Sequence, residues 1–310
     1  MKKTALVTGA AGFIGSHLCD RLLKEGWVVY GVDNLQAGKR ENLREAFKSK
    51  DFYFSDTDIL SISLRYPPQR LDVVFHLAAS KKNICLKDPR RDLDTNGKGT
   101  LKLLQMAKKN GAKKFIFSST GSVYGDCGRD TISETTPLNP CSYYGISKEA
   151  GDRYVQYFSK EGLLDTTVLR YFHIYGPRQD WGTFGGVVAI WINNVLVGKG
   201  CVLSGDRNIT RTFTYVGDVV EANIRAIETE PGTVLNISSG EQTALWALYT
   251  RILLTTKKEC NISIAPGLVG DVGYYDVNNR ESKKALGLKY TDFIPGLKET
   301  VHWHKERLGL

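Results

Sequence analysis

Short apolar runs alternate with longer amphipathic segments along the first two thirds of the chain. The runs are rich in β-branched and aromatic residues and predict strands at residues 6–8, 27–32, 52–54, 73–76, 115–118 and 166–169. Between them, apolar residues recur with helical spacing and predict helices near residues 18–23, 40–48, 96–110 and 144–161. Buried strands that alternate with helices favour a parallel sheet with helices on both of its faces.

The pattern changes after residue 175. Glycine and aromatic residues become denser there, and an apolar helix is predicted over residues 187–197. We therefore expect an α/β protein with a doubly wound parallel sheet in residues 1–174, to which residues 211–230 return. Residues 175–210 and 231–310 are expected to form a smaller C-terminal α/β domain. Because no linker separates the two parts, a ligand cleft is expected between them, at the carboxyl ends of the strands.

Three glycines follow the first predicted strand with the spacing G-x-x-G-x-x-G, namely Gly9, Gly12 and Gly15. The same segment opens the first predicted helix. In this place glycines permit a tight turn and a close approach of the backbone to a pyrophosphate, which the helix N-terminus attracts. The spacing and its position predict a dinucleotide site. A glycine-rich turn without a ligand is the alternative.

An acidic residue, Asp33, ends the second predicted strand, about 20 residues beyond the last glycine. A carboxylate at this spacing is suited to bind both hydroxyls of the adenosine ribose, and it would repel a 2′-phosphate. We therefore expect NAD rather than NADP. Asp58 and Ile59 follow the third predicted strand and are expected to hold the edge of the adenine.

A phenol and an ammonium share one face of the helix predicted over 144–161, because Tyr144 and Lys148 stand at positions i and i+4. A fall of the phenol pKa from about 10 to near 7 corresponds to about 4 kcal/mol of differential stabilisation of the phenolate. The lysine together with a nicotinamide cation can supply that stabilisation. Thr120 ends an earlier predicted strand, where its hydroxyl would bridge Tyr144 and a substrate hydroxyl. These three residues are the predicted catalytic group.

The composition excludes several classes of protein. The chain has 310 residues, of which 42% are hydrophobic and 24% charged, so it can bury a large core. No stretch approaches the roughly 20 consecutive apolar residues of a membrane span. The first apolar run breaks too early for a signal peptide, so we expect a soluble, cytoplasmic protein.

Six cysteines are spread singly, with neither a C-x-x-C pair nor a histidine at metal-ligand spacing. We expect free, buried or half-buried thiols in a reducing compartment and no metal site. The formal net charge is +9, but the basic residues form scattered pairs instead of one run. Nucleic acid is therefore not an expected partner, and the positive charge would instead help to attract a small anionic substrate.

Ordered motifs along the whole chain resemble the extended short-chain dehydrogenase/reductases, in particular the nucleotide-sugar epimerases and dehydratases. The matching pieces are VTGAAGFIG (7–15), DNL (33–35), GKRENL (38–43), HLAA (76–79), FIFSST (115–120), YYGISK (143–148), LRYFHIYGPRQ (169–179) and RTFTYVGDVV (211–220). The resemblance implies a Rossmann domain that holds NAD and a small domain that binds a nucleotide-diphospho-sugar. It also implies a homodimer through a four-helix bundle, built here from residues 96–110 and 144–161.

The resemblance implies a set of further site residues. Lys148 would hold the ribose hydroxyls and lower the pKa of Tyr144. Further cofactor contacts would come from Phe13, Ile14, Asn34, Leu77, Ala78, Ala79, Lys81, Asn96, Ser118 and Tyr171. Substrate contacts would come from Ser122, His173, Arg178, Arg211 and Arg280. Among these, Arg211 matches an arginine that clamps the diphosphate, and His173 stands where most relatives have asparagine.

The two residues after Thr120 indicate which reaction of the family to expect. In the family's 4,6-dehydratases an Asp-Glu pair follows this threonine, and UDP-glucuronate decarboxylases usually carry Glu at the second place. This chain has Gly121 and Ser122 there. Lys81 matches a cofactor-contacting lysine of galactose epimerases. We therefore expect a 4-epimerase that closely resembles the UDP-sugar 4-epimerases and works through a transient 4-keto sugar.

Other readings stay open at this point. A dehydratase, decarboxylase or reductase of the same family is the first alternative, because the epimerase assignment rests on the absence of acids after Thr120. A non-catalytic dinucleotide-binding sensor is a lower alternative, since Tyr144 and Lys148 are both intact. The nucleotide base and the sugar are not determined by these motifs, although a UDP-sugar is the expected substrate.

Overall fold

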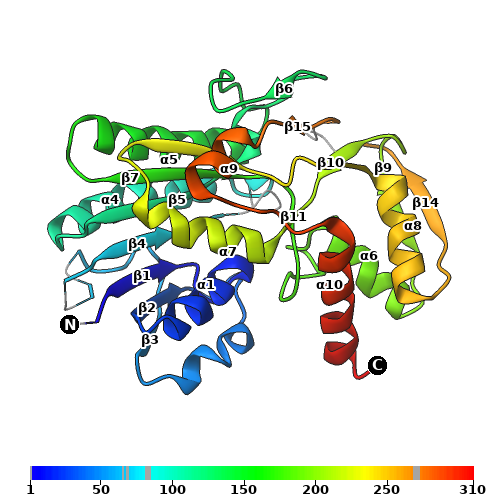
Figure 1. Ribbon diagram of the computed structural model, residues 1–310, viewed down its shortest axis with the longest axis horizontal. Coiled ribbons are helices and arrows are strands. Elements are labelled where there is room, and N and C mark those ends of the chain that lie inside the picture. The colour runs from blue at the N-terminus through cyan, green and yellow to red at the C-terminus, as the bar shows by residue number, and fades with distance from the viewer. Residues whose placement is uncertain (1, 65, 68–69, 81–84, 268–272) are drawn as a thin grey trace.

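A seven-stranded parallel sheet forms the centre of the molecule (Figure 1). The computed structural model describes residues 2–64, 66–67, 70–80, 85–267 and 273–310. Within these residues the strand order is β12-β7-β5-β4-β1-β2-β3, and every neighbouring pair is parallel. The strands are β1 (Thr4–Thr8), β2 (Val28–Asp33), β3 (Phe52–Asp56), β4 (Val73–His76), β5 (Lys114–Thr120), β7 (Thr166–Tyr171) and β12 (Thr233–Ile237).

Helices cover both faces of this sheet. On one face lie α1 (Phe13–Lys24) and α7 (Val216–Arg225), and on the other lie α4 (Gly99–Lys109) and α5 (Tyr143–Lys160). The alternation along β1 shows how the sequence fills both layers. Ala5 and Val7 belong to the first core, whereas Leu6 between them belongs to the second. The expected doubly wound α/β fold is confirmed.

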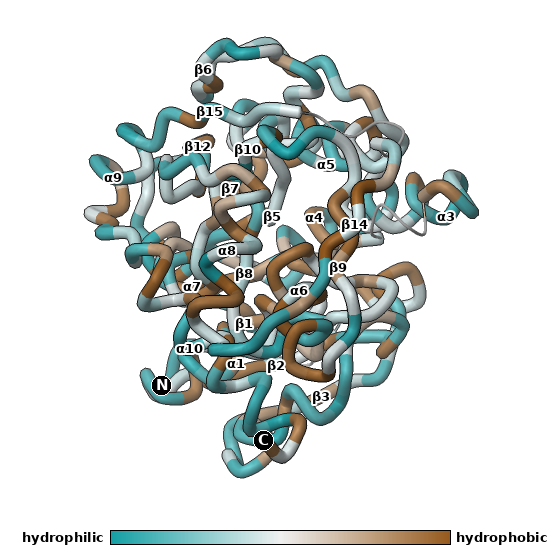
Figure 2. Tube along the Cα trace, turned by 90° about the vertical axis from the view of Figure 1, so that its right-hand side faces the viewer, coloured by the Kyte–Doolittle hydropathy of each residue, from teal (hydrophilic) through white to brown (hydrophobic). Residues whose placement is uncertain are grey.

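A smaller group of elements lies beside the carboxyl end of the sheet (Figure 1). It contains α6 (Val187–Leu196), α8 (Leu245–Thr256) and α10 (Phe293–Leu308), whose apolar faces share a separate core. Figure 2 shows hydrophobic stretches of α6 and α8 in this part of the chain. Four two-stranded sheets accompany it in the described residues. They pair β9 (Cys201–Ser204) with β14 (Ile262–Ala265), β10 (Thr210–Thr212) with β13 (Gln242–Ala244), β8 (Ile174–Tyr175) with β11 (Thr214–Tyr215), and β6 (Thr131–Ile132) with β15 (Asp276–Val277).

The structure corrects three local expectations. Residues 40–48 form two short 3₁₀ turns, Arg40–Leu43 and Ala46–Lys48, in place of one helix. The helix predicted over 96–110 begins with a π-helical turn, Asp94–Lys98, after the short helix α3 (Pro89–Leu93). Strand β12 belongs to the central sheet and not to the smaller domain, because it pairs in parallel with β7. Helix α9 (Arg280–Leu286) packs near that strand.

The cysteines are not all buried or half-buried as expected. Cys141 is exposed, whereas Cys19, Cys85 and Cys201 are buried. A search of the described residues for a cluster of metal-ligating side chains finds none. In the same part of the chain, no helix has the length and apolar character needed to cross a membrane.

Helix α10 carries a fully buried histidine without polar partners. His304 is 0% exposed, and neither ring nitrogen has a hydrogen-bond partner among the described residues. Its ring lies against two indoles, with centroid distances of 5.2 Å to Trp181 and 5.0 Å to Trp303. Burial lowers the pKa of this imidazole to about 4, so it is neutral near pH 7.

Replacing His304 by phenylalanine is expected to remove an acid-sensitive element of stability. Between pH 6.5 and 4 the unfolded chain binds a proton at this histidine that the folded chain excludes, so the free energy of unfolding falls as the pH falls. Because His304→Phe leaves no hydrogen bond unmade, its free energy of unfolding at pH 7 is expected to lie within about 1 kcal/mol of that of the parent. At pH 4.5 it should be more stable by roughly 2–3 kcal/mol. Urea unfolding at the two pH values measures these free energies. An equal loss of unfolding free energy in both proteins between pH 7 and pH 4.5 would contradict the prediction.

Candidate active site

The turn between β1 and α1 is built from backbone contacts that leave no room for side chains. Gly9 has φ +70°, and its carbonyl accepts a hydrogen bond from the amide of Gly12 at 3.0 Å. A Cβ on Gly15 would lie 2.1 Å from that carbonyl oxygen, and a Cβ on Gly9 would lie 2.8 Å from the amide nitrogen of Ala78. Glycine at these positions therefore allows the turn, the first helical residues and the end of β4 to meet.

Helix α1 begins without the usual capping groups. Its N-cap residue is Gly12, which has no side chain to accept a hydrogen bond, and no acidic residue stands in the first turn. The amide groups at this end lack a side-chain cap and carry the positive end of the helix dipole. This arrangement suits an anionic group such as a pyrophosphate.

Asp33 closes the other side of the turn. One carboxylate oxygen accepts from the amide of Ala11 at 3.0 Å and the other from the amide of Leu35 at 2.8 Å. Burial raises the pKa of this carboxyl, while the backbone amides act to lower it. A Cβ on Gly38 would lie 2.8 Å from both carboxylate oxygens, so the segment after β2 folds closely over Asp33. The carboxylate keeps lone pairs that can accept from ribose hydroxyls.

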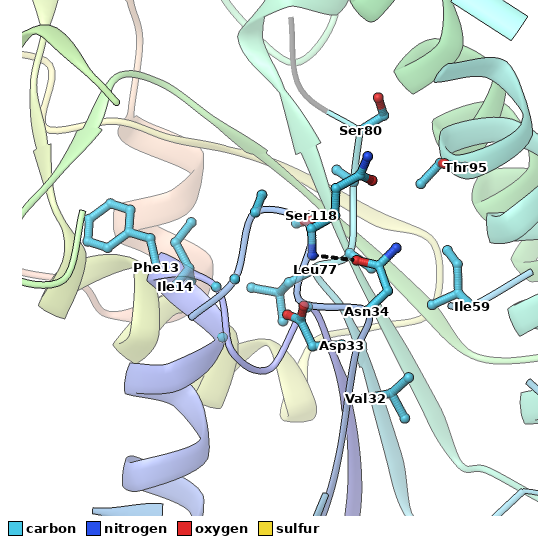
Figure 3. Close-up of a pocket in the computed structure, with 18 of the residues that line it drawn as sticks. Phe13, Ile14, Val32, Asp33, Asn34, Ile59, Leu77, Ser80, Thr95 and Ser118 are labelled. Atoms are coloured by element: carbon cyan, nitrogen blue, oxygen red, sulfur yellow. Dashed lines mark hydrogen bonds between the residues drawn. The ribbon is translucent and has the colours of Figure 1, made fainter. Parts of the chain in front are cut away.

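A cavity of about 340 Å³ joins this turn to the catalytic group (Figure 3). Figure 3 shows Phe13 and Ile14 on one side, Asp33 and Asn34 at the end of β2, and Ile59 on the opposite side. The predicted site residues that line it are Gly9, Gly12, Phe13, Ile14, Gly15, Asp33, Asn34, Asp58, Ile59, Leu77, Ala78, Ala79, Ser118, Thr120, Tyr144, Lys148, Tyr171 and Arg178. Residues far apart in sequence therefore meet at the carboxyl ends of the parallel strands, as expected.

The three predicted catalytic residues face this cavity together. Helix α5 starts at an N-cap, Ser142, whose hydroxyl accepts from the amide of Gly145 at 3.1 Å, so the first turn holds Tyr144 in a defined position. Burial raises the pKa of the Tyr144 phenol above its ordinary value, and the neighbouring Thr120 side chain acts in the opposite direction.

Lys148 lies one helical turn further on. Its ammonium donates to the carbonyl of Ser118 at 2.5 Å and lies 4.2 Å from the centroid of the Phe117 ring. Burial lowers the pKa of Lys148 to about 7, while the carboxylate of Asp152 acts to raise it. The side chain is 1% exposed, so its protonation depends strongly on what else enters the cavity.

A buried ion pair supports this part of the site. Asp152 is 0% exposed and accepts from Arg170 Nε at 3.0 Å and from the Ser119 hydroxyl at 2.8 Å. The Arg170 guanidinium also donates to the Tyr124 hydroxyl at 2.8 Å. The pair thereby joins α5 to β5 and β7, with Ser119 next to Thr120 in β5 and Asp152 one helical turn after Lys148.

Asn96 is not among the residues that line the cavity, and its role as a cofactor contact stays a prediction. Its amide oxygen accepts from the Ser80 amide at 2.9 Å, and its amide nitrogen donates to Asp92 and to the Ser147 hydroxyl, both at 2.9 Å. The π-helical turn directs this side chain between helix α5 and the chain after β4. Lys81, another expected contact, lies outside the described residues.

The expected substrate residues are distributed over three places. His173 has φ +44°, and its ring lies against Phe213 and Tyr275, with centroid distances of 6.2 and 5.0 Å. Burial and the charge of Arg211 lower the pKa of this histidine. Arg211 donates to the carbonyls of Thr210 and Gly273 at 2.9 and 3.0 Å and is nearly buried beside His173. These two residues are brought together, outside the lining of the cavity described above.

The remaining substrate candidates are separated from that pair. Arg178 has φ +66° and forms an ion pair with Asp20 of α1 at 2.7 Å, so it lies on the dinucleotide side. Arg280 is exposed at the start of α9. Ser122 lies beside Thr120, whose hydroxyl accepts from the Ser122 amide at 3.2 Å.

Sequence reasoning missed several residues of the cavity wall, which are Val32, Gln36, Ala37, Gly38, Lys39, Asn42, Thr57, Ser80, Thr95, Ser119, Ile174 and Asp180. For Gly38, Lys39 and Asn42 a signal existed, because they lie in the segment 38–43 that carries the family resemblance. Asp180 had no such signal, since it reaches the wall only through the fold.

Comparison with known proteins decides the family. The model of the NAD dependent epimerase/dehydratase family matches residues 5–238. The chain belongs to this family. The UDP-glucose 4-epimerase of Mycolicibacterium smegmatis is 35% identical, and the match covers 97% of this chain and 98% of that protein. UDP-glucuronic acid decarboxylases of Arabidopsis thaliana and Xenopus tropicalis are also similar, at 30% and 28% identity.

Solved structures give the same result. A UDP-glucose 4-epimerase of Thermotoga maritima with UDP-glucose has 38% identity and a TM-score of 0.93, with 98% of this chain and 99% of that chain covered. A UDP-glucuronic acid 4-epimerase of Bacillus cereus, in complex with UDP-glucuronic acid and NAD, has 30% identity and a TM-score of 0.92, with coverage of 98% and 99%. The chain is an NAD-dependent enzyme. The uncapped end of α1, the glycine turn and the half-shielded Asp33 carboxylate fit NAD.

Gly15→Ala is expected to weaken NAD binding. The new methyl group would stand 2.1 Å from the Gly9 carbonyl oxygen, which is backbone and has nowhere to move without opening the turn. Calorimetric titration should show at least a tenfold loss of NAD affinity, and the melting temperature should fall. Gly200→Ala is the matched control, because its Cβ would meet only the Asn261 carbonyl at an ordinary 3.5 Å. Unchanged NAD affinity in Gly15→Ala would refute the assignment of the turn.

Proposed function

We propose that this enzyme interconverts the C4 epimers of a UDP-linked sugar. The observation that carries the proposal is the meeting of Tyr144, Thr120 and Lys148 on the cavity that also contains the glycine turn and Asp33. A hydroxyl-bearing substrate carbon and a dinucleotide can be held side by side in such a cavity. The relatives named above are enzymes of UDP-sugars, which supports this substrate class.

Oxidation of a secondary alcohol removes a proton from oxygen and a hydride from carbon. NAD, when bound, supplies the acceptor of that hydride and later its donor. The phenol oxygen of Tyr144 takes the proton of the sugar 4-hydroxyl and returns it after the 4-keto sugar has turned in the pocket. Thr120 lines the same cavity, and its hydroxyl orients the sugar hydroxyl toward the phenol oxygen.

The charge at Lys148 assists this proton transfer. Burial alone keeps the Tyr144 phenol protonated, since it raises the pKa. A nearby cation favours the phenolate, and Lys148 stands one helical turn away with its ammonium anchored on the Ser118 carbonyl. We assign Lys148 to the ribose hydroxyls and to this electrostatic role.

Packing beneath Thr120 disfavours dehydration. A Cβ on Gly121 would lie 2.4 Å from the Phe172 ring, so an acidic side chain at this position would require the ring to move. The next residue, Ser122, uses its amide to bind the Thr120 hydroxyl and carries no carboxylate. The acids that would remove a proton next to a 4-keto group are therefore not supplied at these two positions.

The substrate lobe is proposed to hold the nucleotide-sugar. Arg211 and His173 adjoin each other at the junction of β8, β10 and the smaller core, where a guanidinium can bind a diphosphate and an imidazole can donate to the sugar. The lobe comprises residues 175–210 and 238–310, without strand β12. We place the enzyme in the cytoplasm, because singly spread cysteines are typical of a reducing compartment.

Tyr144→Phe is expected to reduce kcat for epimerisation at least about 100-fold, because the proton acceptor is lost while the ring still packs. The assay follows UDP-galactose and UDP-glucose by NMR with the purified protein and no added NAD. Tyr143→Phe is the matched control, since Tyr143 is the neighbouring, 56% exposed residue of the same helix. Equal activity of the two variants would contradict the assignment of Tyr144.

Product analysis separates the epimerase from its alternatives. Incubation with UDP-glucose, UDP-N-acetylglucosamine and UDP-glucuronic acid should give the C4 epimer of at least one of them, with no net NADH. Release of carbon dioxide from the uronic substrate would establish a decarboxylase instead. Accumulation of a 4-keto-6-deoxy product would establish a dehydratase, and binding without turnover would establish a sensor.

The exposed face of α5 supports dimerisation. Four large apolar side chains follow one stripe of this helix at helical spacing, namely Tyr143, Ile146, Tyr154 and Tyr157, which are 42–56% exposed. Exposed apolar stripes of this kind are typical of helix–helix interfaces. We propose that α4 and α5 of two copies form a four-helix bundle.

Tyr157→Asp is expected to yield monomers, because a carboxylate would be buried without a partner in the bundle. Sedimentation velocity should show the mass of one chain, 34.5 kDa, in place of two. Leu254→Asp is the control, since Leu254 is 73% exposed on α8, away from this stripe. A parent protein that is monomeric at micromolar concentration would refute the proposed bundle.

A further inference from the structure

Two segments from different parts of the chain line the NAD cavity on its open side. One is the segment after β2, which contributes Gln36, Lys39 and Asn42. The other follows β8 and contributes Arg178 and Asp180. Neither segment belongs to the strand ends that hold the glycine turn and the catalytic group. In the described part of the chain, side chains of Lys39, Asp180 and Trp181 make contacts between them.

An ion pair connects these two walls. Lys39 Nζ lies 2.8 Å from Asp180 Oδ1, across 141 residues of sequence. The Lys39 side chain is 42% exposed and that of Asp180 17%, so the pair lies at the rim of the cavity and not on its floor. A second pair, between Arg178 and Asp20 at 2.7 Å, ties the same segment to α1.

Both partners of the rim pair are held in position. The second carboxylate oxygen of Asp180 accepts from the amides of Gly182 and Phe184 at 3.1 and 3.2 Å. The Lys39 ammonium lies 5.1 Å from the centroid of the Trp181 ring, within the range of a cation–π contact. The carboxylate is therefore preorganised to receive the ammonium.

Helix α10 contacts both of the segments that line the open side of the cavity. Trp181 packs against Trp303 and His304 of this helix, with centroid distances of 5.9 and 5.2 Å. Arg307, near the end of the same helix, forms an ion pair with Glu41, two residues beyond Lys39. The walls are thus attached to one rigid element, and the rim pair is the contact that must break if they separate at the cavity mouth.

We propose that Lys39 and Asp180 form a latch that limits the release of NAD from the cavity. The latch acts on the cofactor and not on the sugar, so it goes beyond the proposed epimerase activity. An enzyme must retain NADH in its cavity if the reduced cofactor is to return its hydride within the same turnover. Because the pair is partly exposed, salt screens it, and release should become faster as the ionic strength rises.

The experiment measures release of NADH directly. NADH is bound to the purified protein and chased with excess NAD, and the loss of its fluorescence in a stopped-flow instrument gives the release rate. Lys39→Gln and Asp180→Asn are each expected to accelerate release roughly three- to fivefold, the range of a partly exposed ion pair. The double variant should release NADH no faster than either single variant, because all three have lost the same contact. None of the three should retain the salt dependence of the parent.

Charge reversal tests the pairing itself. Lys39→Glu combined with Asp180→Lys is expected to recover at least part of the parent rate. Lys2→Gln is the matched control, since Lys2 pairs with Asp51 at a similar exposure of 50% and 26% but lies outside the cavity lining. Its release rate should equal that of the parent.

Two results would overturn the latch. If Lys39→Gln accelerates release while Asp180→Asn slows it or leaves it unchanged, Lys39 binds the dinucleotide itself. If the effects of the single variants multiply in the double variant, the two side chains act independently. Because no step of the assay uses a sugar, failure of the latch would leave the proposed epimerase activity untouched, and the reverse is also true.

Discussion

The site depends on one tight contact, between the first turn of α1 and the backbone that precedes it. With the Gly9 carbonyl 2.1 Å from where a Cβ on Gly15 would stand, the helix can begin only where it does. That position aims the amides of α1 at the cavity and brings Ala78, at the end of β4, against the turn. The carboxyl ends of β1, β2 and β4 are thereby locked together, and the rest of the site is built on that edge.

Buried charge is the second organising feature. Lys148 and Arg170 are nearly inaccessible, and Asp152 accompanies both of them. Charges in such surroundings are stable only with partners, so these side chains restrict how α5 can pack on β5 and β7. The helix that carries Tyr144 is held in place by the same contacts that influence the charge of Lys148. The packing of α5 and the charge of Lys148 therefore depend on the same set of contacts.

Much of this arrangement follows from patterns within short stretches of the chain. The strands, the glycine turn, Asp33 and the Tyr144–Lys148 pair were all expected, because each depends on spacing along one segment or on the rule that parallel strands end at one edge. What short stretches did not indicate involves contacts between segments. Asn96 turns into the packing between α5 and the end of β4, and β12 joins the sheet although the chain has already entered the smaller lobe.

The amino-acid order by itself therefore determined the class of fold, the family and the cofactor. These properties are carried by local periodicity and by motifs whose geometry repeats wherever a strand leads into a helix. Only the tertiary structure decided that Asp180 meets Lys39, that Arg178 faces α1 and that Arg211 adjoins His173. Such pairs join positions that are many residues apart, and their formation depends on the packing of whole elements, which no local pattern records.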